Sequence, residues 1–288
     1  MTESELPSHY TLILTCPDKR GIVTAVAGTL ADIDCNIEES SQFGDADTGH
    51  FFMRLHFSSP QQIGIDQLRD HFRPLAKRYS MWWEMHPHTY KARMLIMVSK
   101  HDHCLSDLLY RWRIGSMPVD ITRVVSNHET CREIVEREGL RFDHLPINKS
   151  NKKQQETALR KMIDEDSANL IVLARYMQIL SNRLANDYLG RVINIHHSFL
   201  PSFKGARPYH QAHARGVKII GATAHYVTPD LDEGPIIEQE TERVTHNMSA
   251  NDLVIGGREI ERRVLARAIK YHIEHRVLIN NMKTVVFH

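Results

Sequence analysis

Two short segments of the chain contain an amide, an imidazole and a carboxylate that could act together on one small group. The first runs from Asn194 to Pro201 and includes His196; the second begins 31 residues after Asn194, at His225, and includes Asp232. An amide N–H and an imidazole can stabilise negative charge developing on an oxygen, and a carboxylate can move protons for an attacking nucleophile. Water-assisted transfer of a one-carbon acyl group would use these groups.

The elements expected around these residues allow them to converge. Residues 191–195 are typical of a buried strand, so Asn194 and His196 should lie at its carboxyl end with side chains on the same side, because strand side chains alternate. Asp232 follows another strand-like segment, in a loop that can reach the same edge. Ligands of open α/β sheets bind beyond the carboxyl ends of the strands. We therefore predict an active site at this edge.

Each residue also has a structural interpretation. The chain has 19 histidines, and most histidines are surface groups or hydrogen-bonded core groups. Asn194 could cap a turn, and residues 232–234 could form an ordinary loop. Taken singly, each residue therefore favours its structural role.

The composition is that of a soluble globular protein and disfavours several functional classes. With 288 residues, 42% apolar and 25% charged, the chain can form one large domain or two of ordinary size. A formal net charge of +1 gives no electrostatic basis for nucleic-acid binding. No apolar run approaches the ~18 residues of a membrane span, and the acidic N-terminus lacks a signal core. Four widely spaced cysteines favour reduced thiols in the cytoplasm over a disulfide framework or a zinc cluster.

The first part of the chain predicts a small α/β domain. The expected elements are a strand over 9–15, a helix that opens at Gly21, a hairpin over 36–43 and 51–57, a helix over 61–77 and a strand over 80–86. This βαββαβ order is that of a ferredoxin-like module. Residues 86–91 lack periodicity and contain a proline, so we place the domain boundary there, with domains at 1–87 and 88–288.

The second domain is predicted to be α/β with a mostly parallel, doubly wound sheet. The expected strands are 93–98, 119–125, 142–145, 169–173 and 191–195, and the helices between them are 103–113, 129–138 and 151–165. Near-continuous apolar strands indicate a parallel sheet covered on both faces. Segments 217–227 and 235–240 should add as antiparallel strands. We expect the C-terminal amphipathic helix to begin or break at Gly256 and Gly257, because each glycine costs about 1 kcal/mol inside a helix.

The two polar segments resemble a specific family signature. Asn-Ile-His-x-Ser-Phe-Leu-Pro followed by His-x-Val-Thr-x-x-Leu-Asp-x-Gly-Pro is similar to the formyltransferase family, which includes glycinamide ribonucleotide transformylase and methionyl-tRNA formyltransferase. The resemblance implies that Asn194, His196 and Asp232 are catalytic and that 10-formyltetrahydrofolate is the formyl donor. Residues 174–180 resemble the family's folate-pocket strand end. The substrate-binding residues implied are Arg175, Met177, Gln178, Leu180, His225, Thr228 and Asp230.

One departure from the transformylase pattern concerns the acceptor. Transformylases that accept glycinamide ribonucleotide have a Gly/Ser/Asn-rich loop after the first strand, whose backbone N–H groups hold the phosphate. Residues 99–104 contain no glycine here, and Lys100 is the cationic side chain of this loop that could still contact a phosphate. A phosphorylated amine is therefore disfavoured, and water becomes the expected acceptor. We expect Phe203, Tyr209 and neighbouring bulk to narrow the acceptor side of the cleft.

The chain as a whole resembles the formyltetrahydrofolate deformylase family, in which a ferredoxin-like ACT domain precedes a formyltransferase-type hydrolase domain. Pro-Asp-Lys-Arg-Gly-Ile at 17–22 is similar to the start of an ACT-domain helix, and residues 202–212 are similar to the deformylases. The implied reaction is hydrolysis of 10-formyltetrahydrofolate to formate and tetrahydrofolate, which would balance the one-carbon pool for purine biosynthesis. The alternatives are transfer to an amine such as glycinamide ribonucleotide, and an inactive amino-acid sensor.

Few other ligands are expected. The folate is the substrate, and we expect no cofactor. The cluster from His101 to Cys104 has metal-ligating groups, but adjacent residues rarely converge on one ion, so we expect no metal. ACT domains often pair through their sheets and bind small amino acids at the junction, which implies a homo-oligomer, dimer or tetramer, and an amino-acid effector. We expect no nucleic-acid or membrane partner.

Overall fold

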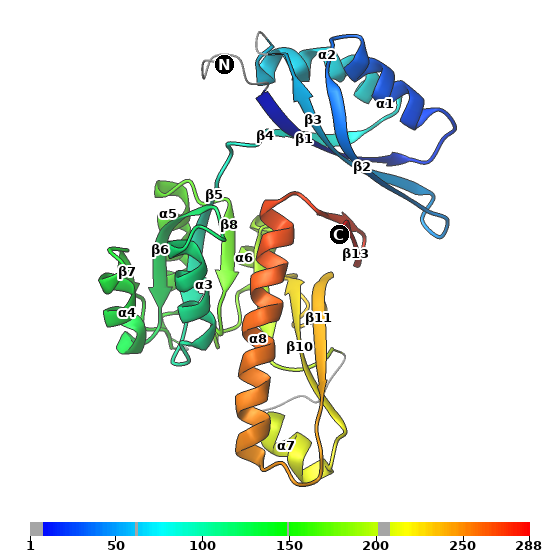
Figure 1. The fold of residues 1–288 in the computed structure, drawn as a ribbon. Helices are drawn as coiled ribbons and strands as arrows, with labels where there is room; N and C mark the ends of the chain where they lie inside the picture. The colour runs from blue at the N-terminus through cyan, green and yellow to red at the C-terminus, as the bar shows by residue number, and fades with distance from the viewer. Residues whose placement is uncertain (1–7, 61–62, 149, 201–207) are drawn as a thin grey trace. The chain divides into compact units, whose positions relative to one another are not determined.

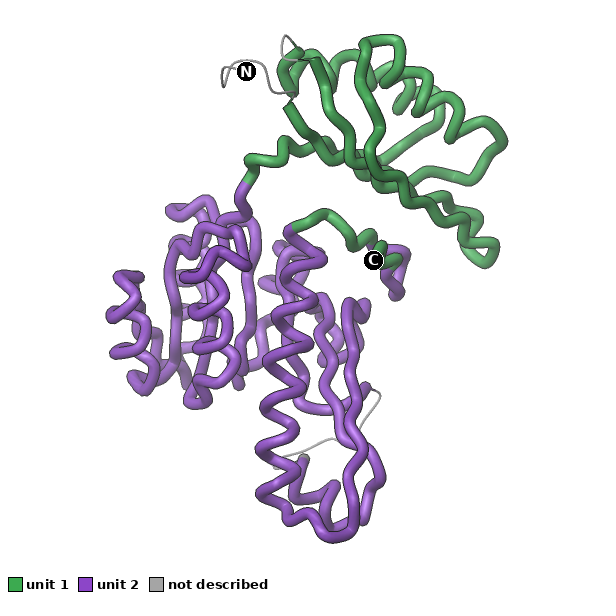
Figure 2. Tube along the Cα trace, in the orientation of Figure 1, with its two compact units in different colours: residues 1–90, 274–278, 285–288 green, residues 91–273, 279–284 purple. Residues whose placement is uncertain are grey.

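The computed structural model describes residues 8–60, 63–148, 150–200 and 208–288. The chain forms two compact units (Figure 2). The first runs to Tyr90 and also contains residues 274–278 and 285–288, and the second contains residues 91–273 and 279–284. Part of the C-terminal segment, which we expected in the second domain, is therefore grouped with the first unit.

The first unit has the predicted βαββαβ order (Figure 1). Its elements are β1 (Ser8–Pro17), α1 (Ile22–Ala31), β2 (Asn36–Asp45), β3 (His50–Ser59), α2 (Ile65–Arg78) and β4 (Trp82–Pro87). The strands form one antiparallel sheet in the order β2-β3-β1-β4. Leu12 and Leu55, on one face of this sheet, share a core with Val26 of α1 and Phe72 of α2. The ferredoxin-like prediction is confirmed.

The end of the chain adds a second, smaller apolar cluster to this unit. β12 (Val277–Asn280) and β13 (Lys283–Val286) form a two-stranded sheet that the sequence did not predict. Phe287 packs with Ile13 and Phe52 in this cluster. Because side chains alternate along a strand, Ile13 and Phe52 lie on the sheet face opposite the helices. The C-terminal segment thus covers part of that face.

The second unit is built on a seven-stranded sheet in the order β11-β10-β9-β8-β5-β6-β7. Its strands are β5 (Ala92–Val98), β6 (Val119–Ser126), β7 (Phe142–His144), β8 (Leu170–Leu173), β9 (Val192–His196), β10 (Ile219–Tyr226) and β11 (Ile236–Arg243). The pairs from β7 to β9 are parallel, and β10 and β11 join in antiparallel orientation. The mostly parallel α/β fold is confirmed.

Helices and one short 3₁₀ turn connect these strands, and a long helix follows β11. They are α3 (His103–Arg113), the 3₁₀ turn Glu129–Cys131, α4 (Arg132–Arg137), α5 (Lys152–Glu165), α6 (Asn182–Asp187), α7 (Pro208–Arg215) and α8 (Ala250–Ile273). β5 and β8 are neighbours although β6 and β7 lie between them in the sequence, so the strand order reverses there. Ligands of such sheets bind in the crevice at this reversal.

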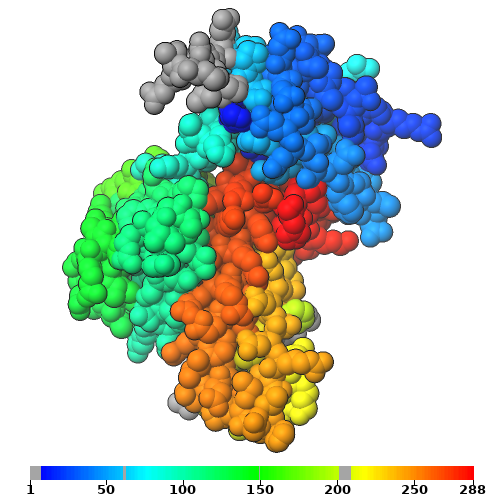
Figure 3. Space-filling view, in the orientation of Figure 1, coloured from blue at the N-terminus to red at the C-terminus, as the bar shows by residue number. Residues whose placement is uncertain are grey.

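The long helix α8 corrects one expectation. The helix is 24 residues long and runs without a break through Gly256 and Gly257, whereas we expected it to begin or break at these glycines. The reason lies in packing, because a Cβ at position 257 would come within 2.1 Å of the Tyr209 ring. The outer side chains of α8 form part of the surface of the second unit (orange in Figure 3). Within the described residues, neither this helix nor any other is long and apolar enough to cross a membrane.

Candidate active site

Pairing of β9 with β10 brings the two predicted segments together. The strands are antiparallel, with Asn194 opposite His225 and His196 opposite Thr223. Leu173, at the end of β8, is the parallel neighbour of Asn194, so the polar side chains collect beyond the carboxyl ends of the central strands. The structure therefore fulfils the geometric condition for the predicted site.

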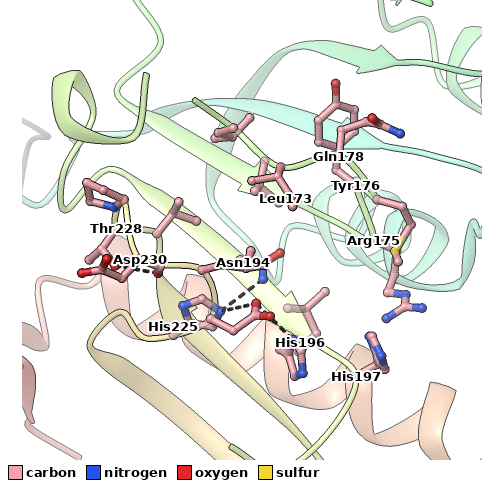
Figure 4. A pocket seen from close by; sticks show the side chains of 18 residues that line it. Leu173, Arg175, Tyr176, Gln178, Asn194, His196, His197, His225, Thr228 and Asp230 are labelled. Atoms are coloured by element: carbon pink, nitrogen blue, oxygen red, sulfur yellow. Dashed lines mark hydrogen bonds and ion pairs between the residues drawn. The ribbon is translucent and has the colours of Figure 1, made fainter. Parts of the chain in front are cut away.

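A cavity of about 210 Å³ opens beside these strand ends. Its walls come from three stretches of chain: residues 173–180, residues 194–197 and residues between 225 and 232. All the residues predicted as catalytic or substrate-binding line it, namely Asn194, His196, Asp232, Arg175, Met177, Gln178, Leu180, His225, Thr228 and Asp230. Figure 4 shows several of their side chains around the shared space. The structure brings these residues together; the chemical role of each stays a prediction.

Asp232 is held at the cavity by a tight loop after β10. Its backbone is left-handed, with φ of 58°, a conformation that aspartate adopts more readily than most residues. Two residues later, a Cβ on Gly234 would lie 1.8 Å from the carbonyl oxygen of Tyr226, so the loop can approach β10 this closely only with glycine. The resulting loop places Oδ1 of Asp232 3.1 Å from Nδ1 of His196.

The contact between His196 and Asp232 sets the charge of the carboxylate. The hydrogen bond from His196 lowers the pKa of Asp232 below its ordinary value, and burial opposes this only in part. The carboxylate is therefore ionised at neutral pH and can orient a water molecule or accept its proton. Because Nδ1 of His196 faces Asp232, Nε2 is the ring nitrogen left for a substrate oxygen.

His225 fixes the orientation of the Asn194 amide. Its Nδ1 lies 2.9 Å from the carbonyl oxygen of Tyr226, which can only accept a hydrogen bond, so Nδ1 carries the proton. Burial lowers the pKa of His225, which favours the neutral ring with Nε2 as an acceptor. Asn194 Nδ2 donates to this nitrogen at 3.2 Å (Figure 4). One amide hydrogen of Asn194 is thereby held, which leaves the other for an oxygen in the cavity.

The loop after β8 supplies an apolar wall. Its backbone is anchored where the N–H of Met177 donates to the Ser99 hydroxyl at 2.9 Å. Met177 and Ile179 are 54% and 60% exposed, so large apolar side chains are presented beside the cavity. Such a surface suits a flat aromatic ring. On another wall, the Thr228 hydroxyl donates to the backbone carbonyl of Asp230 at 3.1 Å and so shapes its own loop.

At one end of the cavity, the guanidinium of Arg175 lies near His197 (Figure 4). Burial, together with the Arg175 cation, lowers the pKa of His197 to about 4, so its ring is neutral at neutral pH. Glu261 of α8, which is 1% exposed, lies 3.3 Å from Nε of Arg175. Neither His197 nor Glu261 was predicted from the sequence as a site residue. For Glu261, the sequence offered one indication: it is a carboxylate beside the apolar stripe of α8, close to Ile260 and Val264, where a charged side chain is unexpected.

His103, Cys104 and Glu261 offer ligand atoms that lie within 4.8 Å of one another. Glu261 is thus the distant partner that the sequence did not reveal for the cluster at 101–104. The donor set nevertheless does not suit a metal ion. The cation of Arg175 is already 3.3 Å from Glu261, and burial followed by the charge of Glu261 raises the pKa of Cys104 well above its ordinary value. A metal ion would have to overcome the charge of the guanidinium and the cost of ionising this buried thiol.

Tyr209 was expected to narrow the cleft together with Phe203, which lies outside the described residues. The structure places Tyr209 8% exposed on α7, where its hydroxyl donates to Glu261 at 2.7 Å. Burial and the charge of Glu261 raise its pKa, so the hydroxyl keeps its proton. Among the described residues, the cavity wall at this end contains Arg175 rather than Tyr209. The Tyr209 ring therefore lies behind the residues that line the cavity and does not itself narrow it.

The second unit belongs to a known class of protein domain. Residues 92–269 match the formyl transferase family, and the sheet with its polar strand ends defines the second unit as a formyltransferase-type catalytic domain. The crystal structure of glycinamide ribonucleotide transformylase 1 from Symbiobacterium toebii is 27% identical, with a TM-score of 0.65, and the match covers 70% of this chain and 97% of that chain. Nearly a third of the present chain therefore has no counterpart in that structure.

Other relatives match nearly the whole chain. A formyltetrahydrofolate deformylase from Corynebacterium sp. (strain P-1) is 47% identical over 279 residues, which is 96% of this chain and 98% of the relative. The crystal structure of a formyltetrahydrofolate deformylase from Burkholderia mallei is 48% identical with a TM-score of 0.94, covering 98% of this chain and 100% of that chain. The chain therefore belongs to the formyltetrahydrofolate deformylase family.

Proposed function

We propose that the protein hydrolyses 10-formyltetrahydrofolate to formate and tetrahydrofolate. The observation that carries this proposal is the convergence of Asn194, His196 and Asp232 on one cavity, in a chain that belongs to the deformylase family. The products would feed and balance the one-carbon pool that purine biosynthesis draws on.

In the proposed mechanism, the formyl oxygen is bound by Asn194 and His196. With both ring nitrogens of His196 protonated, Nδ1 donates to Asp232 and Nε2 donates to the formyl oxygen, together with the second amide hydrogen of Asn194, as that oxygen gains negative charge. Asp232, ionised because His196 lowers its pKa, orients water toward the formyl carbon and takes up a proton from it. His225 is a positioning residue, because it holds the Asn194 amide.

The proposed reaction balances with water as the co-substrate. The water oxygen forms a bond to the formyl carbon, and the bond from that carbon to N10 of the folate breaks. One water proton reaches N10 through Asp232, and the other is released when formic acid ionises. Electrons are neither gained nor lost overall, so we propose that no cofactor takes part.

We place the folate ring system against the loop after β8. The exposed faces of Met177 and Ile179 offer apolar contact, and the backbone and side chain of Gln178 offer polar groups for the ring edge. Thr228 and Asp230 line the same cavity from the loop that carries Asp232. This arrangement would present the formyl group to the catalytic residues.

A competition assay tests the proposed reaction. The purified protein is given 10-formyltetrahydrofolate with and without glycinamide ribonucleotide, and formate, tetrahydrofolate and formylated ribonucleotide are measured. We expect equimolar formate and tetrahydrofolate, with no formylated ribonucleotide above background. Transfer to the ribonucleotide at a rate matching hydrolysis would support the formyltransferase alternative. No formate under any condition, including with amino acids added, would support the sensor alternative.

For the first unit we propose a regulatory role, with pairing between copies and binding of a small amino acid. β2 is a ten-residue edge strand of the first sheet, and edge strands present backbone groups that another strand can bind. We propose a dimer or tetramer located in the cytoplasm, without nucleic-acid or membrane partners; the four free cysteines are consistent with this location. Light scattering measures the assembly, and formate release with each amino acid tests the effector.

A further inference from the structure

A closed group of polar side chains adjoins the His197 end of the cavity. Its centre is Glu261 on α8, which is 1% exposed. The Tyr209 hydroxyl lies 2.7 Å from one carboxylate oxygen, and Nε2 of His103 and Nε of Arg175 lie 2.7 and 3.3 Å from the other. We call these four residues the Glu261 cluster. It joins α3, α7, α8 and the loop after β8.

The packing and charges of the Glu261 cluster hold it in place. The Tyr209 ring fills the space over Gly257, one helical turn before Glu261, where even a methyl group would collide with it. Burial raises the pKa of Glu261, but the hydrogen bond from His103 and the charge of Arg175 outweigh this and leave it below the ordinary value. The carboxylate is therefore ionised and attracts the guanidinium.

Arg175 is the member that reaches the cavity, and its backbone is unfavourable for an arginine. Its φ of 64° is left-handed, a conformation that is unfavourable for a residue with a Cβ and readily adopted by glycine. The side chain is 11% exposed, and although Nε lies 3.3 Å from Glu261, neither Nε nor Nη1 makes a hydrogen bond within the described part of the chain. Such strain and desolvation persist only where the surroundings hold them, and the ion pair with Glu261 does so.

Arg175 lies at the end of the cavity away from the loop that carries Asp230. Figure 4 shows the guanidinium beside His197, at the opposite end of the cavity from Thr228 and Asp230. In the proposed complex the folate occupies the side formed by the loops after β8 and β10. Among the described residues that line the cavity, Arg175 and His197 are the ones that an acceptor approaching from this end would meet. Water is small enough to lie beside the guanidinium, whereas a larger acceptor would compete with it for space.

We propose that the Glu261 cluster is an acceptor plug: it holds Arg175 in the space that an amine acceptor would need and so restricts formyl transfer to water. The inference rests on the proposed function and assigns it a specificity-determining residue. Arg175 then excludes acceptors rather than contacting folate as the family resemblance implied. Glu261 is a positioning residue that acts through Arg175, and Tyr209 and His103 hold Glu261.

Arg175→Gly tests the plug, because glycine suits the left-handed backbone and removes the side chain. Wild type and variant are incubated with 10-formyltetrahydrofolate and glycinamide, a small amine, and formate and N-formylglycinamide are measured. In the transfer, the amine nitrogen bonds to the formyl carbon, the bond from that carbon to N10 breaks, and an amine proton ends on N10. We expect the ratio of N-formylglycinamide to formate to rise by about tenfold or more over wild type.

Two substitutions on α8 form a matched pair. Glu261→Gln keeps the side-chain shape but removes the charge that holds Arg175, so the same ratio should rise by a smaller factor. Glu259→Gln makes the same chemical change on the same helix, at a side chain that is 47% exposed and paired with Arg262, and should leave the ratio at the wild-type value. An equal change in the ratio of N-formylglycinamide to formate in both variants would contradict the proposal that Glu261 holds Arg175 in place.

The outcomes separate the plug from the proposed function. If a folded Arg175→Gly variant binds tetrahydrofolate but yields formate alone, the acceptor-plug proposal is wrong. That result would show that the Arg175 side chain does not exclude amines by occupying their space. Loss of formate release in this folded variant would also overturn the proposal, because Arg175 would then act in the chemistry. If Arg175→Gly does not fold, Arg175→Asn, which also tolerates positive φ, decides by the same ratio. Failure of the proposed function is recognised separately, as absence of formate release by wild type.

Discussion

Nε2 of His225 lies 3.2 Å from the amide nitrogen of Asn194, and the other ring nitrogen of His225 lies 2.9 Å from the carbonyl oxygen of Tyr226. This chain of contacts fixes the proton on Nδ1 and leaves Nε2 to accept from the amide. His225 therefore aims a hydrogen-bond donor into the cavity, and its effect on the reaction should pass through Asn194.

A double-mutant cycle tests this coupling. Asn194→Ala should lower kcat about 10²–10³-fold, the effect of removing one oxyanion donor. His225→Phe removes the acceptor that orients the amide, so kcat should fall by a smaller factor with KM nearly unchanged. The double variant should be no slower than Asn194→Ala alone, because the two residues act as one unit. Fully additive losses in formate release would show that His225 acts independently.

His197 should make the folded state less stable in mild acid. Burial and Arg175 lower its pKa to about 4 in the folded protein. In the unfolded chain its pKa is about 6.5, so between these values the unfolded chain binds a proton that the folded chain does not. The free energy of unfolding should therefore fall as pH falls, by up to about 1.4 kcal/mol per pH unit for this group. Urea unfolding of His197→Asn should show a shallower loss; slopes equal to wild type would contradict the assignment.

The two neighbouring glycines of α8 should respond oppositely to alanine. Gly257→Ala places a methyl group against the Tyr209 ring and should destabilise the protein by about 1–3 kcal/mol. At Gly256 the nearest atom to an added Cβ is 3.7 Å away, in Ile220. Gly256→Ala should therefore stabilise the helix by about 0.5–1 kcal/mol. Denaturant unfolding of both variants checks the contrast, and destabilisation of similar size at both positions would argue against the packing explanation.

The convergence of Asn194, His196 and Asp232 on one cavity could be predicted from the sequence because local rules place each residue. Asn194 and His196 are two residues apart at a strand end, so the alternation of side chains puts both on one side. The Asp-x-Gly pattern that ends with Gly234 marks the close return of the loop beneath Asp232. The periodicity of apolar residues likewise predicted most strands of both sheets. These features depend on residues close together in the chain.

The Glu261 cluster could not be predicted in this way. His103, Arg175, Tyr209 and Glu261 come from four separate elements, and no local pattern links them. The expected break at Gly257 was wrong for a related reason: contact with Tyr209 outweighs the helix propensity of glycine. Tertiary packing decided both features.

The proposed role of Asp232 as the group that accepts a proton from water is tested by formate release from the Asp232→Asn variant. Asparagine keeps the shape of the side chain but cannot take up the water proton, so the structure predicts a fall in turnover of about 10²–10⁴-fold. Binding of tetrahydrofolate should stay at the wild-type level, because Asp232 acts on the nucleophile. Formate release near the wild-type rate in a folded Asp232→Asn variant would show that Asp232 is not the proton acceptor in hydrolysis.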